Sequence, residues 1–200
     1  MSSERSDITL PPDLSQKSGT GPVRLQEPVY VDSIPPCNHA CPAGENIQAW
    51  LDKAQAGDFE AAWRILVENN PMPSIHGRVC YHPCESACNR GEVDDPVSIH
   101  AVERFLGDLA LAAGWVPEVI AEPSGKKILV VGAGPSGLSA AFHLRRLGHE
   151  VEIRDAGPMA GGMMRFGIPA YRMPREVLDG EVDRIVKRGV KLTLNPKVED

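Results

Sequence analysis

The stretch "KKILVVGAGPSGLSAAFHLRRLGHEVEIRDA", residues 126–156, indicates the architecture of the C-terminal part of the chain. It begins with an apolar strand over 128–131, continues through a glycine-rich turn and an amphipathic helix, and ends in a second strand. A helix over 174–189 and a third strand over 190–195 extend this alternation. Strands that alternate with helices are typical of a parallel sheet, so we expect an α/β, Rossmann-like domain over residues 127–200.

The glycine turn has the spacing G-x-G-x-x-G, with Gly132, Gly134 and Gly137 directly after the first strand. The first glycine permits the tight turn, the second lets a pyrophosphate approach the backbone, and the third lets the helix pack on the strand. Asp155 ends the second strand, 23 residues after Gly132, where a carboxylate would hydrogen-bond ribose hydroxyls. This context favours dinucleotide binding over a turn that merely packs a helix, and leaves FAD and NAD(P) as alternatives.

Charge and hydropathy argue against two classes of protein. The formal net charge of −6 argues against a nucleic-acid-binding protein, because neutralising phosphates requires a basic face. No apolar run approaches the ~20 residues that span a bilayer. The polar start "MSSERSDITL" does not resemble a secretory signal. We therefore expect a cytoplasmic protein without membrane insertion, whose thiols stay reduced.

All five cysteines lie in two short stretches, "PPCNHACPAG" and "GRVCYHPCESACNR". They are Cys37, Cys41, Cys80, Cys84 and Cys88. Clustered, reduced thiols in an odd number indicate metal ligands rather than disulfides. Structural zinc usually shows C-x2-C pairs, whereas the spacing here is C-x3-C, and Cys41-Pro42 is similar to ferredoxin-type runs. The pattern favours an iron–sulfur cluster, with buried structural thiols as the alternative.

Apolar residues recur at helical spacing in three segments around the cysteines. The first begins near Glu45, "NNPMP" ends the second, and the third runs from about Val97 to Ala113. Because Pro83 interrupts the later cysteines, we expect a helical turn broken by a loop there. The residues expected to face the core are Ile47, Trp50, Leu51 and Ala54, then Phe59, Ala62, Trp63, Leu66 and Val67, then Ile99, Val102, Phe105, Leu106 and Leu109.

These patterns divide the chain into four parts. Residues 1–36 are rich in Ser, Pro and Gly and predict a mobile arm. Residues 37–118 predict an α-helical iron–sulfur domain, and residues 119–126 predict a linker. Residues 127–200 predict the first part of the Rossmann-like domain. The histidines of the helical domain are expected at the surface or in helix packing rather than as ligands: His39, His82 and His100.

Several motifs in the same order resemble one known family. "CNHACPAGENIQAWL", "GRVCYHPCESACNRG", "DDPVSIHAVERF", "GAGPSG" and "GGMMRFGIPAYRMP" are similar to the small (beta) subunit of NADPH-dependent glutamate synthase. The same module is found in the N-terminal half of dihydropyrimidine dehydrogenase. The likeness covers roughly residues 35–200. It implies a helical domain with two 4Fe-4S clusters, followed by an FAD domain into which an NAD(P)H domain is inserted.

The resemblance also implies a ligand set for each cluster. One cluster would be held by Cys41, Cys80, Cys84 and Glu103. The remaining thiols, Cys37 and Cys88, would supply half of the other cluster. The family has two further cysteines, at positions that are occupied here by Val29 and Asp32. We therefore expect one 4Fe-4S cluster, or an altered ligand set drawn from the five cysteines.

On the dinucleotide side, the resemblance implies a role for residues in both glycine-containing turns. The pyrophosphate would be cradled by Gly132, Gly134, Pro135, Ser136 and Gly137. Asp155 would hold the adenosine ribose, and Val198 would contact the adenine through its backbone. The residues implied to line the flavin are Gly161, Gly162, Met163 and Arg172. A flexible surface loop is the alternative for "GGMMRFGIP", with core packing the alternative for its methionines.

The activity that the resemblance implies is that of an electron-transfer flavoprotein subunit, an FAD-dependent NAD(P)H oxidoreductase. Electrons would pass between NAD(P)H, FAD and a 4Fe-4S cluster, to or from a partner. That partner would be a redox subunit similar to the glutamate synthase large subunit, another iron–sulfur oxidoreductase, or ferredoxin. No residue stands out as an acid–base catalyst. The alternatives are a cluster-free module that docks a flavoprotein onto a larger complex, and a zinc-stabilised NAD-binding regulator.

A single glycine fingerprint occurs in the sequence, so NAD(P)H is expected to bind a region absent from this chain. Three strands without a return segment would leave an apolar sheet edge and face uncovered. We therefore expect the 200 residues to be the N-terminal part of a longer polypeptide, or to need a partner. Expressed alone, they should be poorly soluble.

Overall fold

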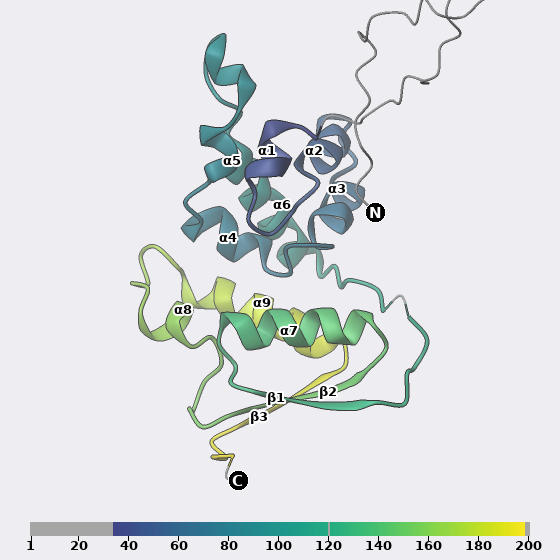
Figure 1. The fold of residues 1–200 in the computed structure, drawn as a ribbon. Coiled ribbons are helices and arrows are strands. Elements are labelled where there is room, and N and C mark those ends of the chain that lie inside the picture. The colour runs from purple at the N-terminus through teal and green to yellow at the C-terminus, as the bar shows by residue number, and fades with distance from the viewer. Residues whose placement is uncertain (1–33, 120, 199–200) are drawn as a thin grey trace, which may run out of the picture. The chain divides into compact units, whose positions relative to one another are not determined.

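The computed structural model describes residues 34–119 and 121–198. From Pro35 onward these residues form one compact unit. The arm predicted over residues 1–36 lies almost entirely outside the described residues, as do Val29 and Asp32. Within the compact unit, a helical part is followed by an α/β part (Figure 1), which confirms the predicted fold class.

Three helices lie where apolar spacing predicts them: α2 (Ile47–Gln55), α3 (Phe59–Leu66) and α6 (Ile99–Ala113). Three shorter helices escape that analysis: α1 (Pro36–Ala40), α4 (Pro73–Val79) and α5 (Pro83–Ser86). Each short helix begins at a proline, a residue suited to the first helical position because the N–H there needs no partner. A 3-10 turn, Asn89–Glu92, follows α5. Within the described residues, none of the helices is both long enough and apolar enough to cross a bilayer.

Side-chain caps begin two of the predicted helices. Asn46 Oδ1 accepts a hydrogen bond from Ala49 N–H at 3.3 Å, and Asp58 Oδ1 accepts one from Ala61 N–H at 3.2 Å. The apolar faces that follow these caps pack into the core, where the side chains without exposed surface include Trp50, Ala62, Trp63 and Leu66. The core prediction for α2 and α3 is therefore confirmed at these positions, whereas it is wrong at Phe59, which is 36% exposed.

Two glycines allow α4 and α6 to pack closely. A Cβ atom at Gly77 would lie 2.6 Å from the backbone N of Arg104, and one at Gly107 would overlap the backbone N of Ser74. Neither position leaves room for a side chain, because packed interiors have few voids. The backbones of the two helices are therefore in direct contact.

This contact gives α6 a buried face that differs from the predicted one. That face consists of Ile99, Glu103, Leu106, Gly107 and Ala110. The prediction that Phe105 faces the core is wrong, since Phe105 is 48% exposed. The helix turns its glycine toward α4, so Phe105 lies on the flank and meets the ring of Phe59 edge-on, with centroids 5.2 Å apart.

The α/β part contains a parallel three-stranded sheet in the order β1-β2-β3. Its strands are β1 (Lys127–Val131), β2 (Glu150–Asp155) and β3 (Val190–Leu194). The register pairs Val130 with Ile153 and Val151 with Val190. The connecting helices are α7 (Pro135–Arg146), α8 (Met163–Phe166) and α9 (Arg175–Lys187). Helices α7 and α9 cover the same face of the sheet (Figure 1), and all these elements except α8 lie where the sequence predicts them.

Among the described residues, no helix covers the opposite face of the sheet (Figure 1). Leu129 and Val131 on β1 are 46% and 67% exposed, so the expected uncovered apolar surface is confirmed at this strand. The same face is charged on the neighbouring strands. There Glu152 forms ion pairs with Arg154 at 2.8 Å and with Lys191 at 3.3 Å.

The segment predicted to be a linker, 119–126, forms neither helix nor strand where it is described. Its backbone is nevertheless held by the end of α7 and the loop that follows it. Ala121 N–H donates to the carbonyl of Arg146 at 3.3 Å, and Ser124 N–H donates to that of Gly148 at 2.9 Å. The segment therefore packs against the α/β part, and the domain boundaries at 118 and 127 stay a prediction.

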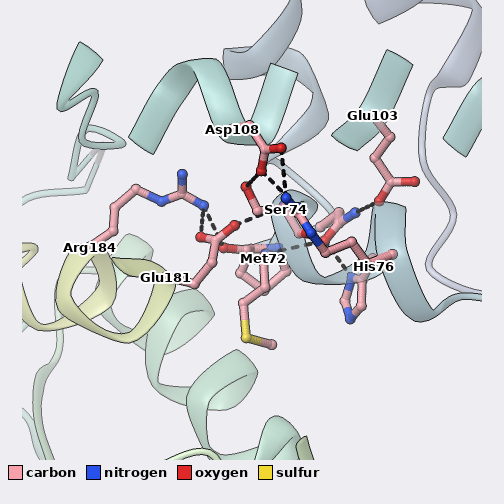
Figure 2. Close-up of polar contacts among 10 residues, drawn as sticks. Met72, Ser74, His76, Glu103, Asp108, Glu181 and Arg184 are labelled. Carbon is pink, nitrogen blue, oxygen red and sulfur yellow. Dashed lines mark hydrogen bonds and ion pairs between the residues drawn. The ribbon is translucent and has the colours of Figure 1, made fainter. Parts of the chain in front are cut away.

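A buried ion pair on α9 joins the α/β part to the helical part (Figure 2). Glu181 has no exposed surface, and its Oε1 accepts a hydrogen bond from Ser74 N–H in the first turn of α4 at 2.9 Å. Arg184 pairs with Glu181, donates to the carbonyl of Pro71 at 3.3 Å and lies over the ring of Trp63. Glu181 thus satisfies a backbone N–H at the start of α4 and neutralises a buried guanidinium.

We expect Glu181→Gln to destabilise the protein by about 3–5 kcal/mol, because it leaves the buried charge of Arg184 uncompensated. The measurement is the free energy of unfolding of the full chain in urea, followed by tryptophan fluorescence. Glu176→Gln, on the exposed side of the same helix, is the matched control and should change that free energy by less than about 0.5 kcal/mol. Equal effects of the two variants would contradict the role of the pair.

Candidate functional site

Three thiols from the two cysteine stretches meet at one cavity in the helical part. Cys41, Cys80 and Cys84 line a cavity of about 160 Å³ together with Glu103. Apolar side chains, including those of Ile47 and Ile99, form other parts of its wall. The structure therefore brings together the four residues that the family resemblance implies for one cluster, although they span more than sixty positions of the sequence.

Helix ends position these thiols. Cys41 and Cys80 are the first residues beyond α1 and α4, and both have extended backbone conformations. His82 then adopts a left-handed conformation with φ 54°, and Pro83 begins α5, which carries Cys84. The later cysteines therefore do not share one helix. The predicted helical turn broken by a loop is confirmed.

Because three thiols and a carboxylate converge on one cavity, they suit a metal centre better than a purely structural role. Burial, together with the neighbouring Cys41, Glu85 and Cys80, raises the pKa of Cys84 to about 12. Burial also raises the pKa of Cys41. Without a cation these thiols hold their protons, whereas binding of a metal displaces protons and compensates the thiolate charges. Soft sulfur ligands in a partly apolar cavity fit an iron–sulfur cluster.

The other two cysteines lie outside the lining of this cavity. Cys37 is half-buried on α1, and Cys88 is half-buried between α5 and the 3-10 turn. Helices α1 and α5 contact each other, so both thiols belong to neighbouring elements. The positions that would complete their ligand set, Val29 and Asp32, lie outside the described residues.

A polar network behind the cavity was not foreseen from the sequence. Asn70 is buried, and its Nδ2 donates to Glu103 Oε1 at 2.6 Å and to Glu45 Oε1 at 3.0 Å. Burial raises the pKa of Glu103 to about 9 and that of Glu45 to about 7. Glu103, a carboxylate on the buried face of α6, was a sequence signal that could have predicted this network. Asn70 carried no such signal, because it lies in the run "NNPMP", which indicated only the end of a helix.

Of the histidines expected at the surface or in helix packing, His82 lies closer to the thiols than the sequence suggested. His82 lines the cavity, and its ring stacks on that of His100 with centroids 4.1 Å apart. His100 Nδ1 lies 2.7 Å from Glu85 Oε1. Ligand atoms of His82, Glu85 and His100 all lie within 4.8 Å of one another. His39, in contrast, is exposed, as expected.

The glycine turn of the α/β part has the geometry that a dinucleotide requires. Gly132 has φ 101°, which favours glycine, and a Cβ at Gly137 would overlap the carbonyl oxygen of Gly132. Gly134 precedes α7, whose first residue is Pro135, so the N–H groups at the start of α7 face the turn. Ser136 is exposed in that first turn. This arrangement suits a pyrophosphate.

Asp155 and a second glycine pair lie against this turn. Asp155 Oδ2 accepts a hydrogen bond from Ala133 N–H at 2.6 Å, and Oδ1 accepts one from Gly157 N–H at 2.7 Å. Gly161 N–H donates to the carbonyl of Ala133 at 2.8 Å. Gly162 has φ 49°, and a Cβ there would lie 2.8 Å from Gly134 Cα. The two glycine segments therefore form one cradle that side chains would fill.

Of the residues implied to line a flavin, Gly161 and Gly162 belong to this cradle, and Met163 directly follows them. Met163 begins α8 and is 71% exposed, and Arg172 is also exposed. Burial and His100 lower the pKa of His82, and the charge of Arg172 lowers it further. Val198 follows β3 and is partly exposed, and no described contact links it to the cradle.

Comparison with family models identifies both parts of the chain. Residues 32–115 match the dihydropyrimidine dehydrogenase domain II, 4Fe-4S cluster family. Residues 130–183 match the NAD(P)-binding Rossmann-like domain family. The first match contains the thiol cavity, and the second contains the glycine cradle.

Curated relatives share most of this chain. It is 40% identical to the NADP(+)-dependent formate dehydrogenase subunit beta of Moorella thermoacetica, over 82% of this chain and 26% of that protein. It is 37% identical to the NADPH-Fe(3+) oxidoreductase subunit beta of Geobacter sulfurreducens, over 82% of this chain and 25% of that protein. It is 38% identical to the glutamate synthase [NADPH] small chain of Mycobacterium tuberculosis, over 79% of this chain and 33% of that protein. The chain thus spans between a quarter and a third of these relatives.

We expect Gly162→Ala to weaken dinucleotide binding about tenfold or more, because its Cβ would press on Gly134 inside the cradle. The measurement is a fluorescence titration of the flavin-free full-length protein with FAD. Gly57→Ala is the matched control, since Gly57 also has a positive φ but has no atom within 4 Å of its Cβ position. Unchanged FAD affinity in Gly162→Ala would contradict this location of the cradle.

Proposed function

This chain belongs to the family of oxidoreductase subunits that includes the glutamate synthase small chain, and from this premise we propose that it is the cluster- and FAD-binding portion of an electron-transfer subunit. The activity would be an FAD-dependent NAD(P)H oxidoreductase. The observation that carries the proposal is the single cavity lined by Cys41, Cys80, Cys84 and Glu103.

The residues of the cavity would hold one 4Fe-4S cluster. Cys41, Cys80 and Cys84 would provide thiolates, and Glu103 would provide a carboxylate oxygen. The apolar wall would limit access of water, which favours a buried cluster. Cys37 and Cys88 would supply only half of a second ligand set, so the proposal includes one cluster.

The cradle would hold FAD. Bound flavin supplies the conversion between two-electron and one-electron transfer. The pyrophosphate would lie against Gly132, Gly134, Pro135, Ser136 and Gly137. Asp155 would receive hydrogen bonds from the ribose, and Val198 would contact the adenine. The residues proposed to line the flavin are Gly161, Gly162, Met163 and Arg172, and NAD(P)H would bind outside the present chain.

A partner would exchange electrons with the cluster. The relatives are named as beta subunits or a small chain, which supports a multi-subunit complex for this protein too. The partner would be a second redox subunit, similar to the glutamate synthase large subunit or another iron–sulfur oxidoreductase, or a ferredoxin. A reducing, cytoplasmic location accords with the five free cysteines.

The test is the visible spectrum of the full-length protein purified without oxygen, combined with iron and sulfide analysis. We expect flavin bands, a broad shoulder that bleaches on reduction, and about four iron and four sulfide per chain. Full flavin with no iron would instead support the cluster-free docking module. Zinc without flavin would support the regulator.

Two cysteine variants locate the cluster. We expect Cys84→Ser to lose most of the bound iron, because it removes a thiolate from the cavity. Cys37→Ser should retain that iron, because Cys37 does not line the cavity. The measurement is iron per flavin, with the low-temperature EPR spectrum of the reduced protein. Loss of iron in Cys37→Ser alone would contradict the proposed ligands.

A further inference from the structure

Two buried carboxylates, Glu45 and Glu103, border the thiol cavity, and either could supply an oxygen ligand. They are linked through one amide, because Asn70 Nδ2 donates to Glu103 Oε1 at 2.6 Å and to Glu45 Oε1 at 3.0 Å. The described lining of the cavity includes no lysine or arginine that could neutralise either carboxylate. Hydrogen bonding must therefore decide which of the two carboxylates is available as an oxygen ligand.

The orientation of the Asn70 amide is fixed by its other side. Asn70 Oδ1 accepts a hydrogen bond from Met72 N–H at 3.2 Å, and a backbone N–H can only donate. Asn70 Oδ1 also lies 2.6 Å from His76 Nδ1, which must then carry the proton. The NH2 group consequently faces the two carboxylates and cannot exchange places with the oxygen. Figure 2 shows Met72, His76 and Glu103 around this network.

The two carboxylates differ in how many oxygens are occupied. Glu45 Oε1 accepts from Asn70 and its Oε2 accepts from Trp50 Nε1 at 3.3 Å, so both oxygens are engaged. Among the described residues, Glu103 accepts only through Oε1. Figure 2 shows its second oxygen turned away from that bond. Glu103 therefore keeps one oxygen free beside the cavity, and Glu45 does not.

We propose that Asn70 is a positioning residue that selects Glu103 over Glu45 as the oxygen ligand of the cavity. It binds one oxygen of Glu103 and so directs the other toward the thiols. Glu45 stays a structural carboxylate, held by Asn70 and Trp50. This inference rests on the proposed cluster at Cys41, Cys80 and Cys84. Groups that orient a metal ligand in this way typically change metal affinity by about 10- to 100-fold when they are removed.

The experiment measures loss of the cluster to a chelator in the anaerobic full-length protein, with the EPR spectrum of the reduced cluster as the second readout. Asn70→Asp removes the donor but keeps an acceptor for Met72 and His76. Asn69→Ala is the matched control, because the neighbouring Asn69 is more exposed and donates to the carbonyl of Gly44. Asn70→Ser serves as a second variant if Asn70→Asp does not fold, which flavin content and the thermal midpoint report.

We expect Asn70→Asp to accelerate cluster loss about 10-fold or more and to alter the EPR spectrum, as should Glu103→Ala. The variant that combines Asn70→Asp with Glu103→Ala should lose its cluster no faster than Glu103→Ala alone, because Asn70 acts through Glu103. Asn69→Ala and Glu45→Gln should keep the wild-type spectrum. A merely structural Asn70 would instead add its effect to that of Glu103→Ala.

Besides such an additive effect, three further results would overturn the inference while leaving the cluster in place. The first is a wild-type rate of cluster loss in Asn70→Asp. The second is a wild-type EPR spectrum in Glu103→Ala, and the third is an altered EPR spectrum in Glu45→Gln. The failure of the proposed function is a different result: wild-type protein that contains flavin but no iron, for which cluster loss cannot be measured.

Discussion

The backbones of α4 and α6 touch because Gly77 and Gly107 have no side chains to keep them apart. This contact organises both ends of α4. At its start, Ser74 N–H reaches the buried carboxylate of Glu181 on α9. At its end, Cys80 lies beside Glu103 of α6 on the thiol cavity. One short helix of seven residues therefore connects the proposed cluster site to the α/β part.

The thiol cavity is an acidic site held in a compact core. Burial raises the pKa of Cys84, Glu45 and Glu103, and no described lysine or arginine lines the cavity. A positively charged metal centre would relieve this cost, since it stabilises thiolates and carboxylate together. The network around Asn70 then has a clear physical role. Burying a carboxylate without a hydrogen bond costs free energy, and one amide donates hydrogen bonds to both carboxylates.

The dinucleotide cradle was largely predictable because its signals are local. Gly132, Gly134 and Gly137 lie within six residues, and the backbone of a tight strand–turn–helix connection requires glycine at Gly132 and Gly137. The helical part was harder. Short α4 lies between prolines and shows no helical period, and Phe105 is rotated out of the core by a contact with α4. Asn70 carries no local signal, since its partners are Glu45 and Glu103.

Residue types and spacing alone determined the class of chemistry, with clustered thiols for a soft metal and a glycine turn after an apolar strand for a dinucleotide. They also determined the order of the two parts. Only the tertiary structure decided which thiols share a cavity and which carboxylate keeps a free oxygen. Those choices depend on packing between helices that are distant in the sequence, and short-range periodicity carries no information about such contacts.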